Sequence, residues 1–482
     1  MNSIFADDLH ERYPRLFSHF WPPHHAIEGS NALTRKLWLH LAHKYSSVQE
    51  ASKGRIGAPA LTTLPLLADT VPRTDLIAIA CATLDPGGAE RQAAYTAWGL
   101  QRRGHPVAVV GYDEHRAFES EYFAPFLLNA GVPLYNAALD LTNIGEAAPN
   151  EQLIWEEEEL RGEALPLELG RMLNRYFRFF MRLRPGVVHA WLDYTNTVVG
   201  LAALWAGVPR VVLGLRNANP MHLPLYQPFF RPFYRLLISD QRTKLVANSN
   251  FGAENYAQWL GIDRASITVI PNGISGAFDQ NAAAMDSSTS LPDETSPLIL
   301  GVFRLYFEKD PLLFVRVAAR VLKSIPKARF RILGDGPLRD AVMKEARRLG
   351  ISDKLEILGR VSDVSLHMRQ SSLLLHTSLF EGLPNALIEA QLAGLPVVTT
   401  NAGGACETLE PNVTGVVLDT RSARQIAEAV VNCLSSPAWL ASARARAPEW
   451  ISEHFSLEKM LANTLAVYAG SSREEPNSGD AI

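Results

Sequence analysis

The sequence has 482 residues, with 46 Lys or Arg and 50 Asp or Glu, so its formal net charge is −4. This near balance gives no electrostatic basis for nucleic acid as the main partner. Hydrophobic residues make up 47% and charged residues 20%, as in chains that bury a core and unlike disordered ones. The length predicts about two or three domains. No apolar run approaches the ~20 residues that a membrane-spanning helix needs.

The three cysteines, Cys81, Cys406 and Cys433, lie far apart in the sequence. They form neither a dense disulfide framework nor a CxxC zinc site, which favours a reducing compartment. The first residues, MNSIFADDLHERY, have acids where a secretory signal has basic residues, and no apolar segment follows them. We therefore expect a cytoplasmic protein.

Residues 1–72 differ from the rest and are predicted to form an N-terminal extension, with a helix from about Asn31 to Tyr45. Four histidines of this segment invite a metal interpretation: His24, His25, His40 and His43. Because no Cys or carboxylate accompanies them at ligand spacing, we interpret them as surface residues. No metal site is predicted.

Short apolar runs alternate with helical segments from Asp75 onward, which is the pattern of a parallel α/β sheet. We predict strands at 76–80, 107–110, 187–191, 211–215, 244–249 and 266–271, and a helix from Gly88 to Arg103. The acidic run at 155–159 is interpreted as a solvated helix face. Residues 73–279 are thus predicted to form one Rossmann-like domain.

The polar segment 280–296 has few large apolar residues and is predicted to be an interdomain linker. A second α/β unit follows over 297–440, with strands at 298–303, 328–334, 354–359, 372–377, 395–400 and 414–419. Most of these strands are apolar on both faces, which indicates a parallel, doubly wound sheet. Helices are expected over 441–470 and a disordered tail over 471–482. The fold class is α/β, with two Rossmann-like domains facing each other across a cleft.

The most informative stretch runs from Ser378 to Gln391 and contains Glu381-Gly382-Leu383-Pro384-Asn385. It follows a strand and opens a helix, with Pro384 expected at the first helical position and Gly394 just after the end. Backbone N–H groups near Asn385, Ala386 and Leu387 would bind a phosphate or diphosphate. Glu389 would then face the ribose of the same ligand, and Glu381 whatever extends beyond the phosphate.

Two cations and one glycine pair occupy other strand ends. Arg304 and Lys309 follow a strand of the second domain, where α/β sheets bind ligands, and could neutralise a leaving diphosphate. No metal would be required, and the sequence contains no Asp-x-Asp to hold Mg²⁺. In the first domain, Gly87 and Gly88 join a strand to a helix and allow close approach of a ligand. A Gly-x-Gly-x-x-Gly fingerprint is missing there, which disfavours a nicotinamide site.

These residues resemble the retaining GT-B glycosyltransferases of family four, which transfer a sugar from a nucleotide-sugar donor. The resemblance covers about Asp75 to Tyr468, and its signature is the Glu-x7-Glu of Glu381 and Glu389. Supporting matches occur at 86–90, 269–274, 333–337, 358–361 and 403–407, together with Arg304 and Lys309.

The resemblance implies a role for each of these positions. Arg304 and Lys309 would bind the donor diphosphate, Glu389 the ribose, backbone near Arg360 and Val361 the base, and Glu381 the transferred sugar. The tail helices, through Trp450 and Phe455-Ser456, resemble the segment that crosses back onto the N-terminal domain. His189 is a candidate near the reacting sugar. This chain has His189-Ala190-Trp191 where family members often have His-x-His, so the nearest position is either His189 or Trp191.

The leading prediction is a retaining hexosyltransferase that uses a UDP- or GDP-sugar, without a cofactor, and a glycan or lipid-linked acceptor in bacterial surface polysaccharide synthesis. Two alternatives stay open, a catalytically idle scaffold of a polysaccharide synthase and a nucleotide-sugar epimerase. Because the acceptor is expected to be lipid-linked, we also expect peripheral contact with the inner face of the membrane. Arg171, Arg175, Arg178 and Arg182 share one helix face, with Phe179, Phe180 and Leu183 at other positions, and are the candidate contact.

Overall fold

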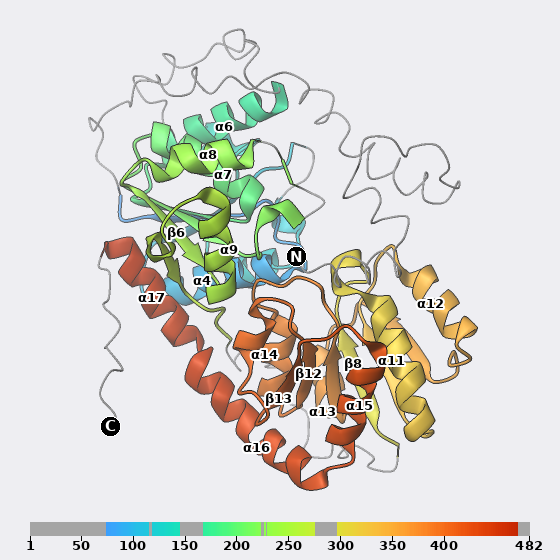
Figure 1. The fold of residues 1–482 in the computed structure, drawn as a ribbon. Helices are drawn as coiled ribbons and strands as arrows, with labels where there is room; N and C mark the ends of the chain where they lie inside the picture. Colours follow the sequence, from blue (N-terminus) through green and yellow to red (C-terminus); the bar gives the residue numbers. More distant parts are fainter. Residues whose placement is uncertain are drawn as a thin grey trace, which may run out of the picture.

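The computed structural model describes residues 74–114, 118–144, 167–222, 226–227, 229–274 and 296–470. The predictions for the extension, the acidic run, most of the linker and the tail lie outside these ranges. The described residues form two α/β units stacked one above the other (Figure 1).

The first unit is built on a parallel sheet of seven strands in the order β3-β2-β1-β4-β5-β6-β7. Its strands are β1 Ile77–Ala80, β2 Val107–Gly111, β3 Leu134–Asn136, β4 Val187–Trp191, β5 Arg210–Leu215, β6 Thr243–Ala247 and β7 Ile267–Val269. Most of their residues are buried on both faces, as the apolar runs predict. Strand β3 was not predicted, because three residues carry too little pattern.

Helices cover both faces of this first sheet. They are α4 Gly88–Arg102, α5 Ala124–Asn129, α6 Leu167–Leu183, α7 Asp193–Trp205, α8 Phe230–Ile238 and α9 Asn250–Leu260. Helices α6 to α9 share one hydrophobic core, whereas α4 and α5 pack into the core on the other face. Phe179 and Phe180 of α6 are completely buried, so these two rings pack against the sheet and are not available to lipid. Short 3₁₀ segments lie at η2 Phe118–Ser120, η3 Asp140–Asn143, η6 Pro220–His222 and η7 Arg264–Ser266.

The second unit has a parallel sheet of six strands in the order β10-β9-β8-β11-β12-β13. The strands are β8 Leu298–Val302, β9 Arg329–Leu333, β10 Leu355–Gly359, β11 Leu373–His376, β12 Val397–Thr400 and β13 Gly415–Leu418. The helices are α11 Pro311–Ser324, α12 Arg339–Arg348, α13 Val364–Arg369, α14 Asn385–Leu392 and α15 Ala423–Leu434, with 3₁₀ segments η9 Phe307–Lys309 and η10 Gly404–Thr408. In each parallel sheet the strand order reverses once, between β1 and β4 in the first sheet and between β8 and β11 in the second. Doubly wound sheets bind ligands at such switch points.

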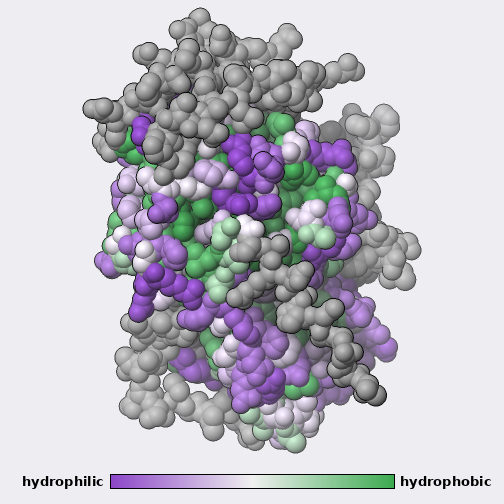
Figure 2. Space-filling view, turned by 90° about the vertical axis from the view of Figure 1, so that its left-hand side faces the viewer, coloured by the Kyte–Doolittle hydropathy of each residue, from purple (hydrophilic) through white to green (hydrophobic). Residues whose placement is uncertain are grey.

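Two final helices, α16 Pro437–His454 and α17 Leu457–Ala469, run from the second unit back along the first (Figure 1). Ser456 begins α17 by accepting a hydrogen bond from the backbone N–H of Lys459. At the same point Ile274 exchanges backbone hydrogen bonds with Phe455 and Leu457. Met460, Leu461 and Tyr468 then enter the core that α4 shares with the first sheet. On the face shown in Figure 2, the lower part of the molecule is mainly hydrophilic, and apolar residues gather over the middle of the upper part.

Candidate active site

Loops that follow the strands of both sheets meet at the boundary between the two units. Asn272, which follows β7, donates hydrogen bonds to the carbonyl of Leu383 (3.1 Å) and to Oδ1 of Asn385 (2.7 Å). Asn385 in turn donates to the carbonyl of Gly88 at the start of α4 (3.1 Å). The Glu-Gly-Leu-Pro-Asn loop is therefore held from the opposite unit at the sheet edge where ligands are expected.

The backbone around Lys309 is fixed by its own neighbours. Asp310 has a left-handed φ of 44°, uncommon for a residue with a side chain, and caps α11 by accepting from the N–H of Leu313. Arg421 holds the Asp310 carboxylate at 2.6 Å. Thr377 donates to the carbonyls of Lys309 and Asp310, each at 3.2 Å. Strand β8 and strand β11 are thereby joined just beyond their carboxyl ends, which places Lys309 opposite the Glu-x7-Glu loop.

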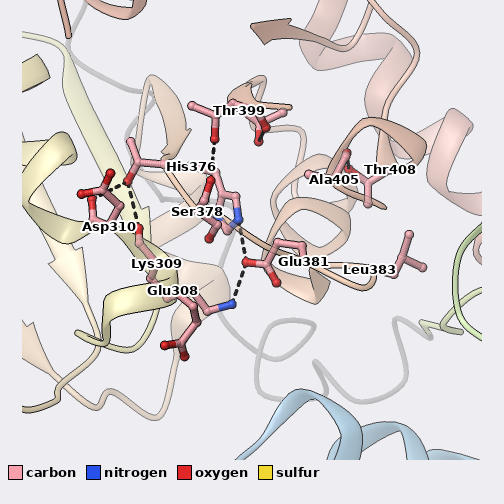
Figure 3. A network of polar contacts seen from close by, with 12 residues as sticks. Glu308, Lys309, Asp310, His376, Ser378, Glu381, Leu383, Thr399, Ala405 and Thr408 are labelled. Carbon is pink, nitrogen blue, oxygen red and sulfur yellow. Dashed lines mark hydrogen bonds and ion pairs between the residues drawn. The ribbon is translucent and has the colours of Figure 1, made fainter. Parts of the chain in front are cut away.

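Glu381 lies at the centre of a polar cluster (Figure 3). Its Oε1 atom is 2.6 Å from Nζ of Lys309 and 3.0 Å from Nε2 of His376. The side chains of Lys309 and Glu381 are only 17% and 9% exposed, and His376 is buried. The carboxylate is thus compensated by two groups from two different strand ends.

Burial by itself would raise the pKa of Glu381, but the Lys309 ammonium and the His376 hydrogen bond outweigh it. They hold the pKa of this carboxyl well below its usual range. Glu381 is therefore ionised at neutral pH, and it can accept hydrogen bonds but cannot donate a proton.

Helix α14 begins one residue later than the sequence analysis predicted. Pro384 is the N-cap residue, with an extended ψ of 112°, and is not the first helical residue. Its carbonyl already accepts a hydrogen bond from the N–H of Leu387 (3.2 Å), so Leu387 contributes less to an anion site than expected. The end of the helix agrees with the prediction, because Gly394 adopts a left-handed φ of 73°.

Glu389 lies one turn into α14 and forms an ion pair with Arg91 of α4, in the opposite unit. The Glu389 carboxylate raises the pKa of Arg91. Gln92, Tyr95, Asn272 and Gly273 line a small pocket with this pair. The second glutamate of the motif therefore contacts the first unit directly.

The remaining predicted second-unit residues are more open. Arg304 is 65% exposed, lies 3.3 Å from Glu308, and has its guanidinium 5.2 Å from the centre of the Tyr306 ring. Arg360 is exposed and Val361 is half-buried, both beyond the carboxyl end of β10. The structure brings Lys309 to Glu381, but it shows no contact of Arg304 or Arg360 with either motif glutamate.

His189 is almost completely buried, at 2% exposed, near the carboxyl end of β4. The hydroxyl of Tyr468, from α17, lies 2.8 Å from its Nδ1 atom. Its ring is tilted against Trp191, with centroids 4.9 Å apart. Burial, and then the nearby charge of Arg216, hold the pKa of His189 well below its usual range, so the imidazole is neutral at pH 7.

Close packing at this boundary, between the two units and within each, requires glycines. A Cβ atom on Gly382 would lie 2.3 Å from the carbonyl oxygen of Arg216, and one on Gly404 would lie 1.7 Å from that of Gly382. At the start of α4, a Cβ on Gly87 would clash with the side chain of Glu90. The glycine at 382 in the motif is thus required by backbone packing against the first unit, in addition to any ligand.

Four residues of this boundary were not predicted as site residues from the sequence: Arg91, Arg216, Asn272 and His376. Two of them had a signal, because Asn272 lies in the Val-Ile-Pro-Asn-Gly-Ile match and His376 ends the strand before the motif. Arg91 directly follows the match at 86–90, but its contact with Glu389 could not be seen from the sequence, and Arg216 had no signal, since the contacts of both residues join segments far apart in the chain. In the described part of the chain, no group of three or more His, Cys, Asp or Glu is arranged to hold a metal ion. Nor does any described helix have the length and apolar character needed to cross a membrane.

Two families match the sequence. Residues 286–450 match the family Glycosyl transferases group 1, and residues 86–276 match Glycosyltransferase Family 4. Among curated proteins, the chain is 27% identical over 421 residues to the Vi polysaccharide biosynthesis protein VipC/TviE of Salmonella typhi, covering 82% of this chain and 72% of that protein. It is also 27% identical over 248 residues to the Escherichia coli UDP-Gal:alpha-D-GlcNAc-diphosphoundecaprenol alpha-1,3-galactosyltransferase, covering 48% of this chain and 62% of that enzyme.

Solved structures show the same fold. Anabaena Alr3699/HepE, in complex with UDP and glucose, aligns with a TM-score of 0.61 at 19% identity, over 82% of this chain and 99% of that one. A glycosyltransferase from Rickettsia africae ESF-5 aligns with a TM-score of 0.63 at 19% identity, over 82% of this chain and 98% of that one. With two doubly wound sheets, the Glu-x7-Glu loop between them and both family matches, the chain belongs to the GT-B glycosyltransferases of group 1, family 4.

Proposed function

We propose that the protein transfers a hexosyl unit, with retention of configuration, from a UDP-sugar to a glycan or lipid-linked glycan. The observation that carries this proposal is the ionised Glu381 carboxylate, held by Lys309 and His376 beside the start of α14. A fixed acceptor of hydrogen bonds at this point suits the hydroxyl groups of a sugar whose diphosphate lies at the helix N-terminus.

The donor diphosphate is proposed to bind between the N-terminus of α14 and the cations at the end of β8. Arg304 is open to solvent and can turn toward a phosphate, and Lys309 already lies at that strand end. Negative charge on the leaving diphosphate grows as the glycosidic bond breaks, and fixed positive groups stabilise it without a metal ion. Alr3699/HepE binds UDP and UDP-glucose, which supports UDP as the nucleotide.

Retention of configuration is proposed to arise from front-face attack, in which the acceptor oxygen attacks the anomeric carbon on the face that the diphosphate leaves. In this step the anomeric carbon loses its bond to the phosphate oxygen and gains one to the acceptor oxygen, and the acceptor proton passes to the leaving phosphate. Glu381 is proposed to hold the transferred sugar in position, because an ionised carboxylate between an ammonium and a buried imidazole is poorly placed to act as an acid.

Glu389 is proposed to bind the ribose diol. In the structure it pairs with Arg91 of the opposite unit, so ribose and Arg91 would share or exchange this carboxylate. This arrangement links the presence of a nucleotide to the contact between the two units.

The acceptor is proposed to be a lipid-linked glycan of a surface polysaccharide. One relative acts on a diphosphoundecaprenol-linked sugar and another serves in Vi polysaccharide biosynthesis, which supports this class. Membrane contact would then be peripheral and electrostatic, through arginines of α6 such as the exposed Arg171, because the phenylalanines of that helix are buried.

The proposal assigns different roles to Glu389 and Glu381, and variants of the two residues test it. Glu389→Gln should weaken UDP binding about 10-fold or more, since a charge-assisted hydrogen bond to the ribose is lost. Glu381→Gln should leave UDP affinity within about twofold while kcat falls on the order of 10²-fold, as expected for an interaction that strengthens in the transition state. Calorimetry with UDP, beside initial rates, measures both. Equal loss of UDP affinity in the two variants would contradict the assignment.

A further inference from the structure

Three nitrogen atoms near the carboxyl ends of β4 and β5 are buried without a hydrogen-bond partner among the described residues. They are Nε2 of His189, Nε1 of Trp191 and Nε of Arg216. Buried polar groups are nearly always paired, so three unpaired nitrogens in one cluster call for an explanation. Trp191 Nε1 and Arg216 Nε can only donate a hydrogen bond, which means that each of these two atoms lacks an acceptor.

The three side chains gather around the indole of Trp191. The Arg216 guanidinium lies over this indole, 3.7 Å from its centre, and the His189 ring is tilted against it, with centroids 4.9 Å apart. Gly214 lies beside them: a Cβ on this residue would lie 3.0 Å from the carbonyl oxygen of Ala190, 3.3 Å from Nε of Arg216 and 3.4 Å from Nε2 of His189. Two of the unpaired nitrogens therefore flank the same point, next to a glycine.

Arg216 has no carboxylate partner in the described part of the chain. Its only polar side-chain contact there is long, 3.5 Å from Nη1 to Oδ1 of Asn272. Burial lowers the pKa of Arg216 to about 9, so the guanidinium still carries its positive charge at pH 7. A half-buried cation without a counter-ion is costly, and an anionic ligand would offset that cost.

The cluster belongs to the same boundary as the Glu-x7-Glu loop. The carbonyl of Arg216 packs against Gly382, and Asn272 bonds both Arg216 and Asn385. The cluster lies in the first unit, whereas the cations assigned to the diphosphate, Arg304 and Lys309, lie in the second. Because the cluster and these two cations lie in different units, we assign an anion bound here to a sugar substrate, and the UDP titration below tests the nucleotide as the alternative.

We propose that Arg216, stacked on Trp191 and flanked by His189, is a specificity-determining site for a carboxylate on the sugar substrate, so that the enzyme handles a uronic-acid-type hexosyl unit. This inference rests on the proposed function, and it names the substrate class of that site. Stacking on the indole fixes the plane of the guanidinium and leaves its edge for a planar, bidentate carboxylate, a match that a lysine cannot make.

The carboxylate could belong to the donor sugar or to the acceptor, and two arms of a binding experiment separate these sources. In the donor arm, calorimetry compares UDP-glucuronate and UDP-galacturonate with UDP-glucose, UDP-galactose and UDP. In the acceptor arm, the protein saturated with UDP is titrated with an oligogalacturonide and with its methyl ester. Each arm uses the wild type, Arg216→Met and Arg216→Lys, with the exposed Arg231→Met of α8 as the matched control.

In either the donor arm or the acceptor arm, the wild type should bind the carboxylated ligand more tightly than the neutral ligand, and the arm that shows this preference identifies the source of the carboxylate. Arg216→Met should reduce that affinity on the order of 10- to 100-fold, as for loss of a charge-assisted pair, and Arg216→Lys should recover only part of it. UDP affinity should be unchanged in both variants, which also shows that they fold, and Arg231→Met should match the wild type throughout.

Two results would overturn the proposal: equal binding of carboxylated and neutral ligands in both arms, or a loss of UDP affinity in Arg216→Met as large as the loss for the carboxylated ligands. The second result would assign the guanidinium to the diphosphate. Failure of the wild type to bind UDP at all would instead refute the proposed donor, and with it this inference.

Discussion

The substitution Lys309→Met measures how much the ion pair between Lys309 and Glu381 contributes to the stability of the fold. In Lys309→Met the Glu381 carboxylate keeps its burial and its contact with His376 but loses the ammonium at 2.6 Å. Breaking one side of a buried ion pair costs about 3–5 kcal/mol, and we take about 3 because His376 remains. At roughly 2–4 °C per kcal/mol, the melting temperature should fall by about 6–12 °C.

The matched control is Arg304→Met, which removes a cation five residues away. Arg304 is 65% exposed and lies 3.3 Å from Glu308, and an exposed pair of this kind contributes about 0–1 kcal/mol. Its melting temperature should therefore stay within about 4 °C of the wild type. The double variant Lys309→Met/Glu381→Gln should recover most of the loss, since no unpaired charge remains buried.

The destabilisation caused by Lys309→Met should depend on pH, because the ionisation of Glu381 differs between the two proteins. In the wild type the pKa of Glu381 is depressed by folding, so its contribution to stability is present above the unfolded pKa and is lost as the pH falls. Without Lys309, burial dominates and Glu381 should become protonated in the folded state at acidic pH. The difference in melting temperature between wild type and Lys309→Met, followed by circular dichroism, should therefore narrow from pH 7.5 to pH 4. A difference below about 2 °C at pH 7.5, or one that is constant with pH, would refute the reasoning.

Three further predictions address the metal, the boundary and a surface pair. Chelation by EDTA should leave initial rates nearly unchanged, and a loss restored only by Mg²⁺ or Mn²⁺ would contradict the proposed role of the cations. Gly404→Ala would place a Cβ 1.7 Å from the carbonyl oxygen of Gly382 and should lower activity at least 10-fold. Gly104→Ala, at a left-handed φ of 82° but with open space around the added Cβ, should only reduce the melting temperature slightly, and equal activities of the two variants would rule out the clash at Gly404. The hydrogen bond from Arg348 lowers the pKa of Glu345 from 4.5 to about 2. Glu345→Gln should therefore reduce the free energy of unfolding at pH 7, and the difference from the wild type should vanish as the pH falls from 4.5 to about 2, which denaturant unfolding across that range can test.

The sequence predicted the sheets well because parallel strands buried on both faces are continuous apolar runs. Of the thirteen strands in the described residues, twelve were predicted, and only β3, Leu134–Asn136, was missed. The motif likewise located Glu381 and Glu389 at a strand end and on a helix. Lys309, the ion-pair partner of Glu381, was among the predicted site residues. The partner of Glu389 could not be predicted, since Arg91 and Glu389 are 298 residues apart and meet only through the way the two units stack. The N-cap position of Pro384 was misjudged by one residue, which is within the usual uncertainty of helix ends.

The path of α17 has a consequence for synthesis on the ribosome. The first unit precedes the second in the sequence, yet its core contains Leu457, Met460, Leu461 and Tyr468, which are translated after the second sheet. Until these residues emerge, the nascent first unit has an apolar surface on α4 that nothing later in its own segment covers. We expect stalled nascent chains ending before Ser456 to be cleaved by protease within the first unit and to bind chaperones, and chains extended past Tyr468 to be resistant. Equal resistance of both would show that the first unit completes its fold before α17 arrives.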